Sequence, residues 1–307
     1  MLAEMVLGVI VLLLGAEVFV RGSVALARLL KWSPLVIGVT VVAIGTSMPE
    51  MTVSVLAAIR GDYGLALGNI VGSNVVNSLL VLSVGILVGS IRIGTTKTPK
   101  NALAMMLATV FYWYWHITGN EGNSYWAYIA LLGVVVFTTL EIWWAWWGKN
   151  HEDEHLSHKD VARNKNWILF IPLALFTIVV GGNLVVTSIE QMSVYYGIST
   201  TILGLVLSSI ATSLPELATT LVGIRQKQEK LVIGNILGSN IYNLLLVGGV
   251  VGFWRQKAAL SAGTWIVFLF SALLTLIIVE MYKGKHLPKK LVWWLLAGFG
   301  GYLLSIF

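Results

Sequence analysis

The amino-acid sequence predicts an all-α integral membrane protein with ten transmembrane helices arranged as two inverted five-helix repeats. Three observations carry this prediction: long apolar runs, a one-sided distribution of basic residues, and an internal repeat. Hydrophobic residues make up 57% of the chain and charged residues only 11%, whereas a soluble domain carries about a quarter charged residues. Runs of about 18 or more apolar residues are typical of membrane-spanning helices, whereas membrane β-barrels have short alternating segments.

Ten apolar runs are separated by charged or turn-rich breaks. We expect their helical cores at 3–29, 35–59, 64–90, 101–117, 124–147, 166–189, 198–223, 231–252, 261–281 and 289–306. The first run is predicted to be a span rather than a cleavable signal peptide, because no basic segment precedes it and it continues past Val20. The predicted organisation is a first repeat over 1–147, a short linker over 148–165 and a second repeat over 166–307.

The basic residues are distributed unevenly over the connections between these runs. Most of the 20 Lys and Arg residues follow odd-numbered runs, whereas the opposite side holds only Arg60, Arg255 and Lys257. Basic residues accumulate in the cytoplasmic loops of membrane proteins. We therefore predict a multi-pass protein of the plasma (inner) membrane of a prokaryote. The 148–165 linker is expected in the cytoplasm, and both termini on the extracellular or periplasmic side.

The sequence repeats itself after a shift of 166 residues. Segment 38–84 overlays segment 204–250 without a gap, with 18 identities over 47 positions. The shared patterns are T-S-x-P-E, at 46–50 and 212–216, and G-N-I-x-G-S-N-x-x-N, at 68–77 and 234–243. Each half carries five predicted spans, and an odd number makes the second copy enter the membrane from the opposite side. Inverted repeats are typical of secondary transporters, whose site lies at the midplane where the repeats meet.

Each T-S-x-P-E pattern places a carboxylate near the middle of an apolar run. Glu50 lies within the second run and Glu216 within the seventh. A charged side chain at membrane depth costs about 3 kcal/mol on insertion scales, and such residues usually face a cavity or a partner. The preceding Pro49 and Pro215 lack a backbone N–H and collide with the preceding turn. Each helix is therefore predicted to split into two half-helices that expose carbonyl groups.

The candidate ligands are all oxygen atoms. They are carboxylates, hydroxyls, freed carbonyls and amides, contributed by Glu50, Glu216, Thr46, Thr212, Ser47, Ser213, Asn77 and Asn243. Hard cations prefer such ligands, and Ca²⁺ takes about six to eight of them in flexible geometry. The chain has no cysteine, which excludes disulfides and thiolate sites and disfavours zinc or copper. Two ionised carboxylates balance one Ca²⁺ or two monovalent ions, so competition would couple these ions as antiport.

The second shared pattern predicts a binding face and close helix packing. Its serine and its last asparagine are four residues apart and share one helix face. These pairs are Ser73 with Asn77 and Ser239 with Asn243. Small residues four apart let helices approach closely. The glycines interpreted as packing devices are Gly68, Gly72, Gly234 and Gly238. The asparagines predicted to form interhelical hydrogen bonds are Asn69, Asn74, Asn235 and Asn240.

With these paired motifs the sequence resembles the cation/calcium exchanger superfamily, and within it the prokaryotic sodium/calcium exchangers. Span number and chain length also match. The resemblance implies that Glu50 and Glu216 are shared by Ca²⁺ and Na⁺, and that Ca²⁺ also binds carbonyl oxygens of Thr46 and Thr212. The residues it implies for completing the Na⁺ sites are Ser47, Ser73, Ser213, Ser239, Ala43 and Ser209, with Asn77 and Asn243 at the middle. Some archaeal relatives have an aspartate where this chain has Asn243, so its centre holds two acids rather than three.

We therefore predict a secondary active antiporter that exchanges Na⁺ for Ca²⁺ by alternating access and needs no cofactor. An alternative on the same fold is an antiporter of Ca²⁺, or another divalent cation, against H⁺, with Glu50 and Glu216 alternately protonated. The hydroxyl ligands favour Na⁺. An ion channel is less well supported, as is an intramembrane hydrolase, because His116 is expected to be unpaired at a helix end. The expected partners are the transported cations and the lipid bilayer, without nucleic acid or an obligate protein partner.

The remaining charged residues are predicted to be peripheral. Glu17 and Arg21 are four apart in the first span and are expected to pair with each other or to reach an interface. The glutamates expected at an interface are Glu141, Glu190 and Glu280. The His-rich stretch 151–158 is interpreted as a solvated cytoplasmic loop rather than a metal-binding tract.

Overall fold

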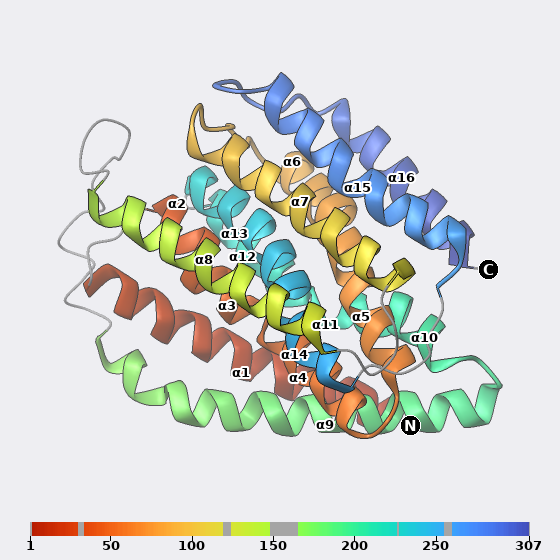
Figure 1. Cartoon of the computed structure of the whole chain (residues 1–307). Helices are drawn as coiled ribbons and strands as arrows, with labels where there is room; N and C mark the ends of the chain where they lie inside the picture. Colours follow the sequence, from red (N-terminus) through yellow and green to blue (C-terminus); the bar gives the residue numbers. More distant parts are fainter. Residues whose placement is uncertain are drawn as a thin grey trace.

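The computed structural model describes residues 2–29, 34–118, 124–147, 165–225, 227–254 and 260–306, which form a bundle of helices (Figure 1). The first half contains α1 (Leu2–Leu29), α2 (Pro34–Ile37), η1 (Gly38–Val42), α3 (Ala43–Thr46), α4 (Met48–Ile59), α5 (Tyr63–Val75), η2 (Val76–Val81), α6 (Leu82–Val88), α7 (Lys97–Thr118) and α8 (Tyr125–Trp147). The second half contains η4 (Lys165–Phe170), α9 (Ile171–Tyr196), α10 (Thr200–Leu203), η5 (Gly204–Ser208), α11 (Ser209–Thr212), α12 (Leu214–Arg225), α13 (Glu229–Tyr242), η6 (Asn243–Val247), α14 (Gly248–Val251), η7 (Gly252–Trp254), α15 (Ala262–Met281) and α16 (Leu291–Ile306).

Within the described residues, eight helical segments are long and apolar enough to cross a membrane. They are Leu2–Phe19, Leu35–Ile59, Tyr63–Val88, Tyr125–Trp144, Ile171–Tyr196, Thr200–Arg225, Glu229–Trp254 and Ala262–Met281. Two further helices, α7 with 22 residues and α16 with 16, pack against them. The prediction of an all-helical membrane protein is thereby confirmed.

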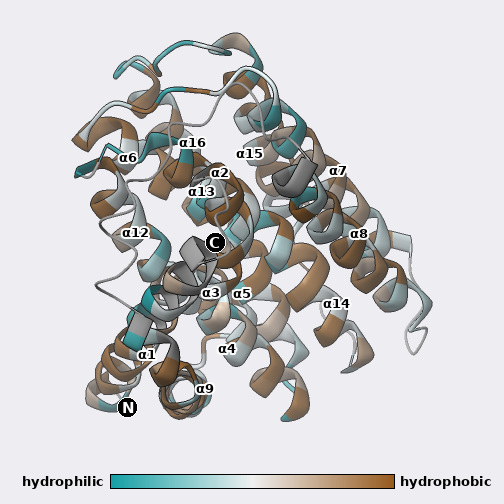
Figure 2. Ribbon diagram, turned by 90° about the vertical axis from the view of Figure 1, so that its left-hand side faces the viewer, coloured by the Kyte–Doolittle hydropathy of each residue, from teal (hydrophilic) through white to brown (hydrophobic). Residues whose placement is uncertain are grey.

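The centre of the bundle is formed by α5 and α13, most of whose residues are buried. Figure 2 shows both helices surrounded by the others. Their four motif glycines lie against the other half of the chain. A Cβ at these positions would lie 2.4–2.9 Å from the carbonyl oxygens of Thr201, Leu205, Leu35 and Val39. Only a residue without a side chain permits so close an approach, and the prediction that these glycines are packing devices is confirmed.

Helices α1 and α9 lie side by side along one edge of the bundle (Figures 1 and 2). Gly8, Gly15 and Gly22 recur every seventh residue on the face of α1 that meets α9. A Cβ at Gly15, for example, would lie 2.9 Å from the backbone nitrogen of Ile178. Regularly spaced small residues thus allow the two helix backbones to approach closely.

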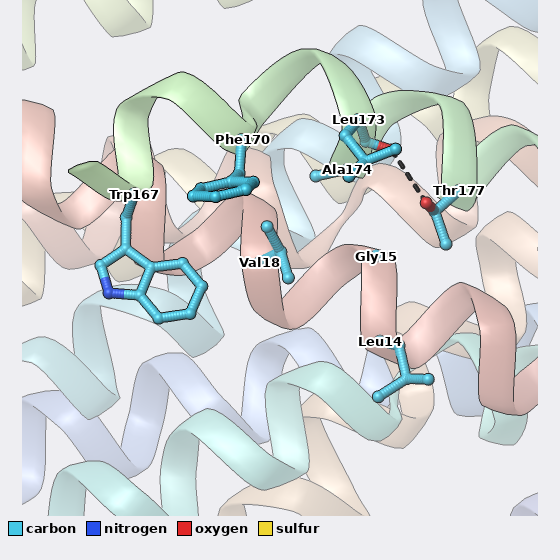
Figure 3. Close-up of a pocket in the computed structure, with 8 residues that line it drawn as sticks. All are labelled: Leu14, Gly15, Val18, Trp167, Phe170, Leu173, Ala174 and Thr177. Carbon is cyan, nitrogen blue, oxygen red and sulfur yellow. Dashed lines mark hydrogen bonds between the residues drawn. The ribbon is translucent and has the colours of Figure 1, made fainter.

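An apolar pocket of about 350 Å³ opens between α1 and the η4–α9 segment (Figure 3). It is lined by Leu14, Gly15, Val18, Trp167, Phe170, Leu173, Ala174 and Thr177. The hydroxyl of Thr177 donates to the backbone carbonyl of Leu173 at 2.8 Å, so its hydrogen is already used within α9. The lining has no charged residue, so this pocket is distinct from the predicted cation site.

The side chain of Arg60, the residue directly after α4, forms hydrogen bonds to α9. One guanidinium nitrogen donates to Glu190 at 2.8 Å and to Thr187 at 3.1 Å, and the other donates to Asn183 at 2.6 Å. Because Arg60 and Glu190 are both partly exposed, their ion pair adds little stability by itself. The fork of hydrogen bonds instead fixes where the end of α4 meets α9.

Two helices are interrupted where the proline motifs predicted a split. Ser47 separates α3 from α4 with φ −82° and ψ 3°, and Ser213 separates α11 from α12 with φ −84° and ψ 5°. These values lie in the sparsely occupied bridge region of backbone conformations. Four π-helical segments, η1, η2, η5 and η6, flank the same region. Such segments often occur at functional sites, and the sequence alone does not predict them.

The peripheral predictions had mixed outcomes. Glu17 and Arg21 pair as expected, and Glu280 is exposed. The prediction that Glu141 is interfacial is wrong, because its side chain is fully buried. The prediction that His116 is unpaired is also wrong, because its Nε2 lies 2.8 Å from the hydroxyl of Tyr63, the first residue of α5. The 151–158 stretch lies outside the described residues.

Candidate cation site

The two motif glutamates are fully buried, each in the first turn of a helix. Glu50 follows Pro49 at the start of α4, and Glu216 follows Pro215 at the start of α12. Proline suits the first turn of a helix because its missing N–H is not needed there. The positive end of the helix dipole also favours a negative side chain at this position. The interruption at the preceding serine therefore places each carboxylate where a new helix begins.

Protein donors satisfy only one of the four carboxylate oxygens. The hydroxyl of Ser213 donates to Oε1 of Glu50 at 3.1 Å, so the second half of the chain contacts the acid of the first half. Oε2 of Glu50 and both oxygens of Glu216 have no hydrogen-bond partner among the described residues. Burying ionised carboxylates without a counter-charge costs several kcal/mol each. The pair can therefore accept a cation, or protons, between the two halves.

The motif threonines and serines meet across the two halves. The Thr46 hydroxyl lies 3.2 Å from that of Ser239, and the Thr212 hydroxyl lies 3.4 Å from that of Ser73. The corresponding residues of the two patterns thus exchange equivalent contacts. This reciprocity places hydroxyl oxygens from both halves beside the buried carboxylates.

Two asparagines and one serine add further unpartnered polar atoms. Asn77 and Asn243 are fully buried, and neither the nitrogen nor the oxygen of either amide has a partner within the described chain. The buried hydroxyl of Ser47 likewise has none. Buried polar groups are nearly always paired in proteins, so orphaned ones call for an explanation. A bound cation would supply the missing partner for the amide and hydroxyl oxygens.

The backbone carbonyls of Ala43 and Ser209 already accept hydrogen bonds. Ala43 accepts from the N–H of Ser47 at 3.0 Å, and Ser209 accepts from the N–H of Ser213 at 3.1 Å. Each carbonyl also accepts a longer hydrogen bond of 3.4 Å, Ala43 from the Thr46 hydroxyl and Ser209 from the Thr212 hydroxyl. A carbonyl oxygen has two lone pairs, so a cation would bind each one in place of the threonine hydroxyl. Both carbonyls lie one helical turn before the interruption, on the buried side of the chain.

Asn69 connects the two motif copies by hydrogen bonds, as predicted. Its Oδ1 accepts from Ser208 at 2.7 Å and from Thr212 at 3.2 Å, and its Nδ2 donates to Ser54 at 3.0 Å. Asn235 has the matching position and accepts from Thr46 at 3.1 Å. Ser54 and Ser208 lie outside the shared patterns, so no sequence motif predicted their contacts with Asn69. Asn69 thereby fixes the orientation of Thr212.

The other two asparagines behave differently from each other. Asn240 donates to the Ser78 hydroxyl at 2.8 Å and so forms the interhelical bond that was predicted. The prediction is wrong for Asn74, whose Nδ2 donates to the carbonyl of Ile70 in its own helix at 2.8 Å. Both motif copies have an asparagine at this position, but the helices that neighbour Asn74 and Asn240 offer different hydrogen-bond partners.

We expect Asn69→Ala to lower the free energy of unfolding by about 2–3 kcal/mol, because it leaves buried hydroxyls without a partner. Asn74→Ala is the matched control, since it removes an equally buried side chain from the same helix but only one local bond. Thermal and chemical unfolding of the purified variants would measure the difference. Equal destabilisation by the two substitutions would contradict the bridging role of Asn69.

Membrane-length helices around two buried carboxylates are the architecture of an ion transporter. Comparison with known proteins identifies the family. The sodium/calcium exchanger protein family matches residues 2–143 and 166–307. The chain therefore belongs to this family, which comprises transporters rather than enzymes.

Individual relatives agree with this assignment. The chain is 32% identical to the putative antiporter CaxA of Alkalimonas amylolytica, covering 91% of this chain and 89% of that protein. It is 28% identical to the sodium/calcium exchanger MaX1 of Methanosarcina acetivorans, over 81% of this chain and 82% of the relative. Its fold is similar to the solved sodium-calcium exchanger NCX_Mj, with a TM-score of 0.73, 25% identity, and coverage of 100% and 98%.

Proposed function

We propose that this protein is a secondary active antiporter that exchanges Na⁺ for Ca²⁺ by alternating access. One observation carries the proposal. Glu50 and Glu216, contributed by opposite halves of the chain, are fully buried among hydroxyl and amide oxygens, and three of their four oxygens lack a partner within the described residues. Two ionised carboxylates balance one Ca²⁺ or two Na⁺, so occupation by one species excludes the other. The exchanger relatives support this assignment.

We infer that the bundle consists of ten transmembrane helices in two inverted repeats, with domains at 1–147 and 166–307 and a linker at 148–165. The match of one family to two stretches of nearly equal length supports this organisation. The reciprocal contacts Thr46–Ser239 and Ser73–Thr212 support it as well. The basic residues favour a plasma-membrane orientation with the linker in the cytoplasm and both termini outside.

The proposed cation ligands are the residues expected from the sequence. The two carboxylates supply the charge that Ca²⁺ and Na⁺ share, and the Thr46 and Thr212 carbonyls add neutral oxygens for Ca²⁺. The remaining proposed ligands are Ser47, Ser73, Ser213, Ser239, Asn77, Asn243, Ala43 and Ser209. Oxygen ligands in this number suit a hard cation of flexible coordination.

An antiporter of Ca²⁺ against H⁺ is the second candidate, because unpartnered buried carboxylates can also accept protons. Purified protein in liposomes distinguishes the two functions. Uptake of radiolabelled Ca²⁺ driven by an outward Na⁺ gradient, at equal pH on both sides, is the expected result. Ca²⁺ uptake driven only by a pH gradient would show that the exchanged counter-ion is H⁺ rather than Na⁺. Saturable uptake that requires the counter-ion would exclude a channel, and the absence of any gradient-driven Ca²⁺ uptake would refute both candidates.

We expect Asn243→Asp to tighten Ca²⁺ binding by about tenfold or more, equivalent to about 1.4 kcal/mol, because it adds a third acid to the centre. The added charge should also change the net charge carried in each cycle. Calorimetric titration would measure the affinity, and the dependence of flux on membrane potential would measure the charge. Asn243→Ala is the control and should weaken binding. Weakening by both substitutions would contradict a central position for Asn243.

A further inference from the structure

A third buried carboxyl group lies outside the candidate cation site, which holds the other two. Glu141 in α8 is fully buried, and neither of its oxygens has a hydrogen-bond partner among the described residues. The side chain of Asn101 in α7 faces it, and the amide nitrogen of Asn101 is itself buried without a partner. A carboxyl group and an amide thus lie together between α7 and α8, and the exchange reaction proposed above uses neither.

Few charged groups surround this carboxyl. The cations that act on it are Lys97 and Lys100 in the first turn of α7, and Lys100 Nζ instead lies over the Trp144 ring, 5.1 Å from its centroid. Within the described chain, no basic side chain comes within ion-pair distance of Glu141. From α13 the only titratable neighbour is Tyr242. Of the described segments packed on α8, the remaining ones, α2, η6, α14 and η7, contain no titratable residue.

An ionised carboxylate in this position would be a buried charge without a direct counter-ion. Such a charge costs several kcal/mol even after relaxation of the protein, whereas a protonated carboxyl is neutral and can also donate a hydrogen bond. A divalent cation is a poor alternative occupant. Ca²⁺ takes about six to eight oxygen ligands, and among the described residues Glu141 is the one acid of this cluster.

The carboxyl group is connected to the cation site through α8 and α13. Thr138 lies one helical turn before Glu141, and its hydroxyl is 2.9 Å from that of Tyr242. Tyr242 ends α13 and directly precedes Asn243, the first residue of η6. A charge appearing at Glu141 would therefore act beside the contact that holds the end of α13, next to η6, against α8.

We propose that Glu141 is a proton-binding site, separate from Glu50 and Glu216, that carries its proton when α8 is packed as in this structure. Loss of the proton makes this packing unfavourable and draws the carboxylate towards water or towards Lys97 and Lys100. Protons at the α7–α8 interface thereby regulate the helix packing beside Asn243. The ligand is a proton from the aqueous phase, and no covalent chemistry takes place.

Infrared difference spectroscopy of the protein in lipid bilayers tests this site without relying on transport. The difference between spectra taken at acidic and at alkaline pH is expected to contain a carboxylic-acid C=O band, from the acidic form, that is missing in Glu141→Gln. The band should persist in the control Glu280→Gln, which alters an exposed glutamate at the end of α15. If no band depends on Glu141, the proposal is overturned. The band could instead appear only after Na⁺ and Ca²⁺ are replaced by a bulky organic cation. Glu141 would then bind a metal cation rather than a proton, and the proposal would equally be overturned.

The pH profile of Ca²⁺ flux supplies a second measurement. Glu141→Gln, which mimics the protonated carboxyl, should keep the flux of the wild-type protein in acidic buffer and lose the change that wild type undergoes on alkalinisation. An unaltered pH profile would overturn the regulatory part of the proposal. Asn101→Leu should shift the pH at which Ca²⁺ flux changes but should not abolish the pH dependence, because Asn101 positions the carboxyl group and does not bind the proton.

Discussion

Replacing Glu50 or Glu216 by Gln is expected to reduce Ca²⁺ affinity by roughly three decades and to abolish measurable exchange. Each substitution keeps the shape of the side chain and removes half of the negative charge at the site. A single charge–charge interaction at about 4 Å is worth about 4 kcal/mol at an effective dielectric constant of 20, and each 1.4 kcal/mol corresponds to about tenfold in affinity. Calorimetric titration with Ca²⁺ and flux in liposomes would measure the effect.

Glu280→Gln is the control for this comparison, because Glu280 is an exposed glutamate at the end of α15. Its substitution removes one negative charge from the protein without touching the buried site, and should leave Ca²⁺ affinity and flux unchanged. Substantial residual exchange in either buried variant, with Ca²⁺ affinity near that of wild type, would contradict the proposed charge balance. Loss of folding is excluded by comparing thermal unfolding of the three variants.

The second large effect is expected from Gly238→Ala. The added Cβ would lie 2.5 Å from the carbonyl oxygen of Val39 and 2.7 Å from the Cβ of Ala43. A backbone oxygen cannot move as a flexible side chain does, so η1 and α3 must shift away from α13. Overpacking of this kind lowers the free energy of unfolding by about 1–3 kcal/mol. Ca²⁺ affinity should also fall, because the shifted segment carries a proposed carbonyl ligand.

Gly300→Ala is the matched control, because nothing lies within 4 Å of the position that a Cβ would occupy there. Both substitutions replace a glycine inside a helix by a better helix former. Unfolding measurements and Ca²⁺ titration should therefore separate them. Gly238→Ala is expected to be less stable than wild type and to bind Ca²⁺ more weakly, and Gly300→Ala is expected to be at least as stable as wild type and to bind Ca²⁺ equally well. Equal stability and equal Ca²⁺ affinity of the two variants would contradict the prediction, because they would mean that η1 can move away from α13 at little cost in free energy.

The parts of the site that the sequence predicted have a common origin. A carboxylate, a proline and a glycine are unusual inside an apolar helix, and each has a specific physical consequence there. These residues recur at the same positions of both motif copies, which is not expected by chance. The buried glutamates and the close glycine contacts could therefore be predicted without a structure. Asn69 and Asn235 were also predicted as interhelical hydrogen-bonders for this reason.

Other features depend on which helices become neighbours. Glu141 and Glu280 both occur near the end of an apolar run, yet one is fully buried and the other exposed. A single sequence contains no signal that side chains of α7, namely Lys97, Lys100 and Asn101, will lie near Glu141. The partner of His116 was missed for the same reason, since Tyr63 is distant in the chain.

By itself, the sequence determined that the chain is a helical membrane protein with a duplicated oxygen-rich motif and two acids at depth. Composition and periodicity are properties of a single helix. In lipid, each helix must also form the hydrogen bonds of its backbone within itself. The tertiary structure alone decided which oxygens remain without partners, which of the repeated asparagines bridge helices, and that Glu141 is buried. These properties arise where two helices meet, because a buried charge or hydrogen-bonding group depends on what the neighbouring helix provides.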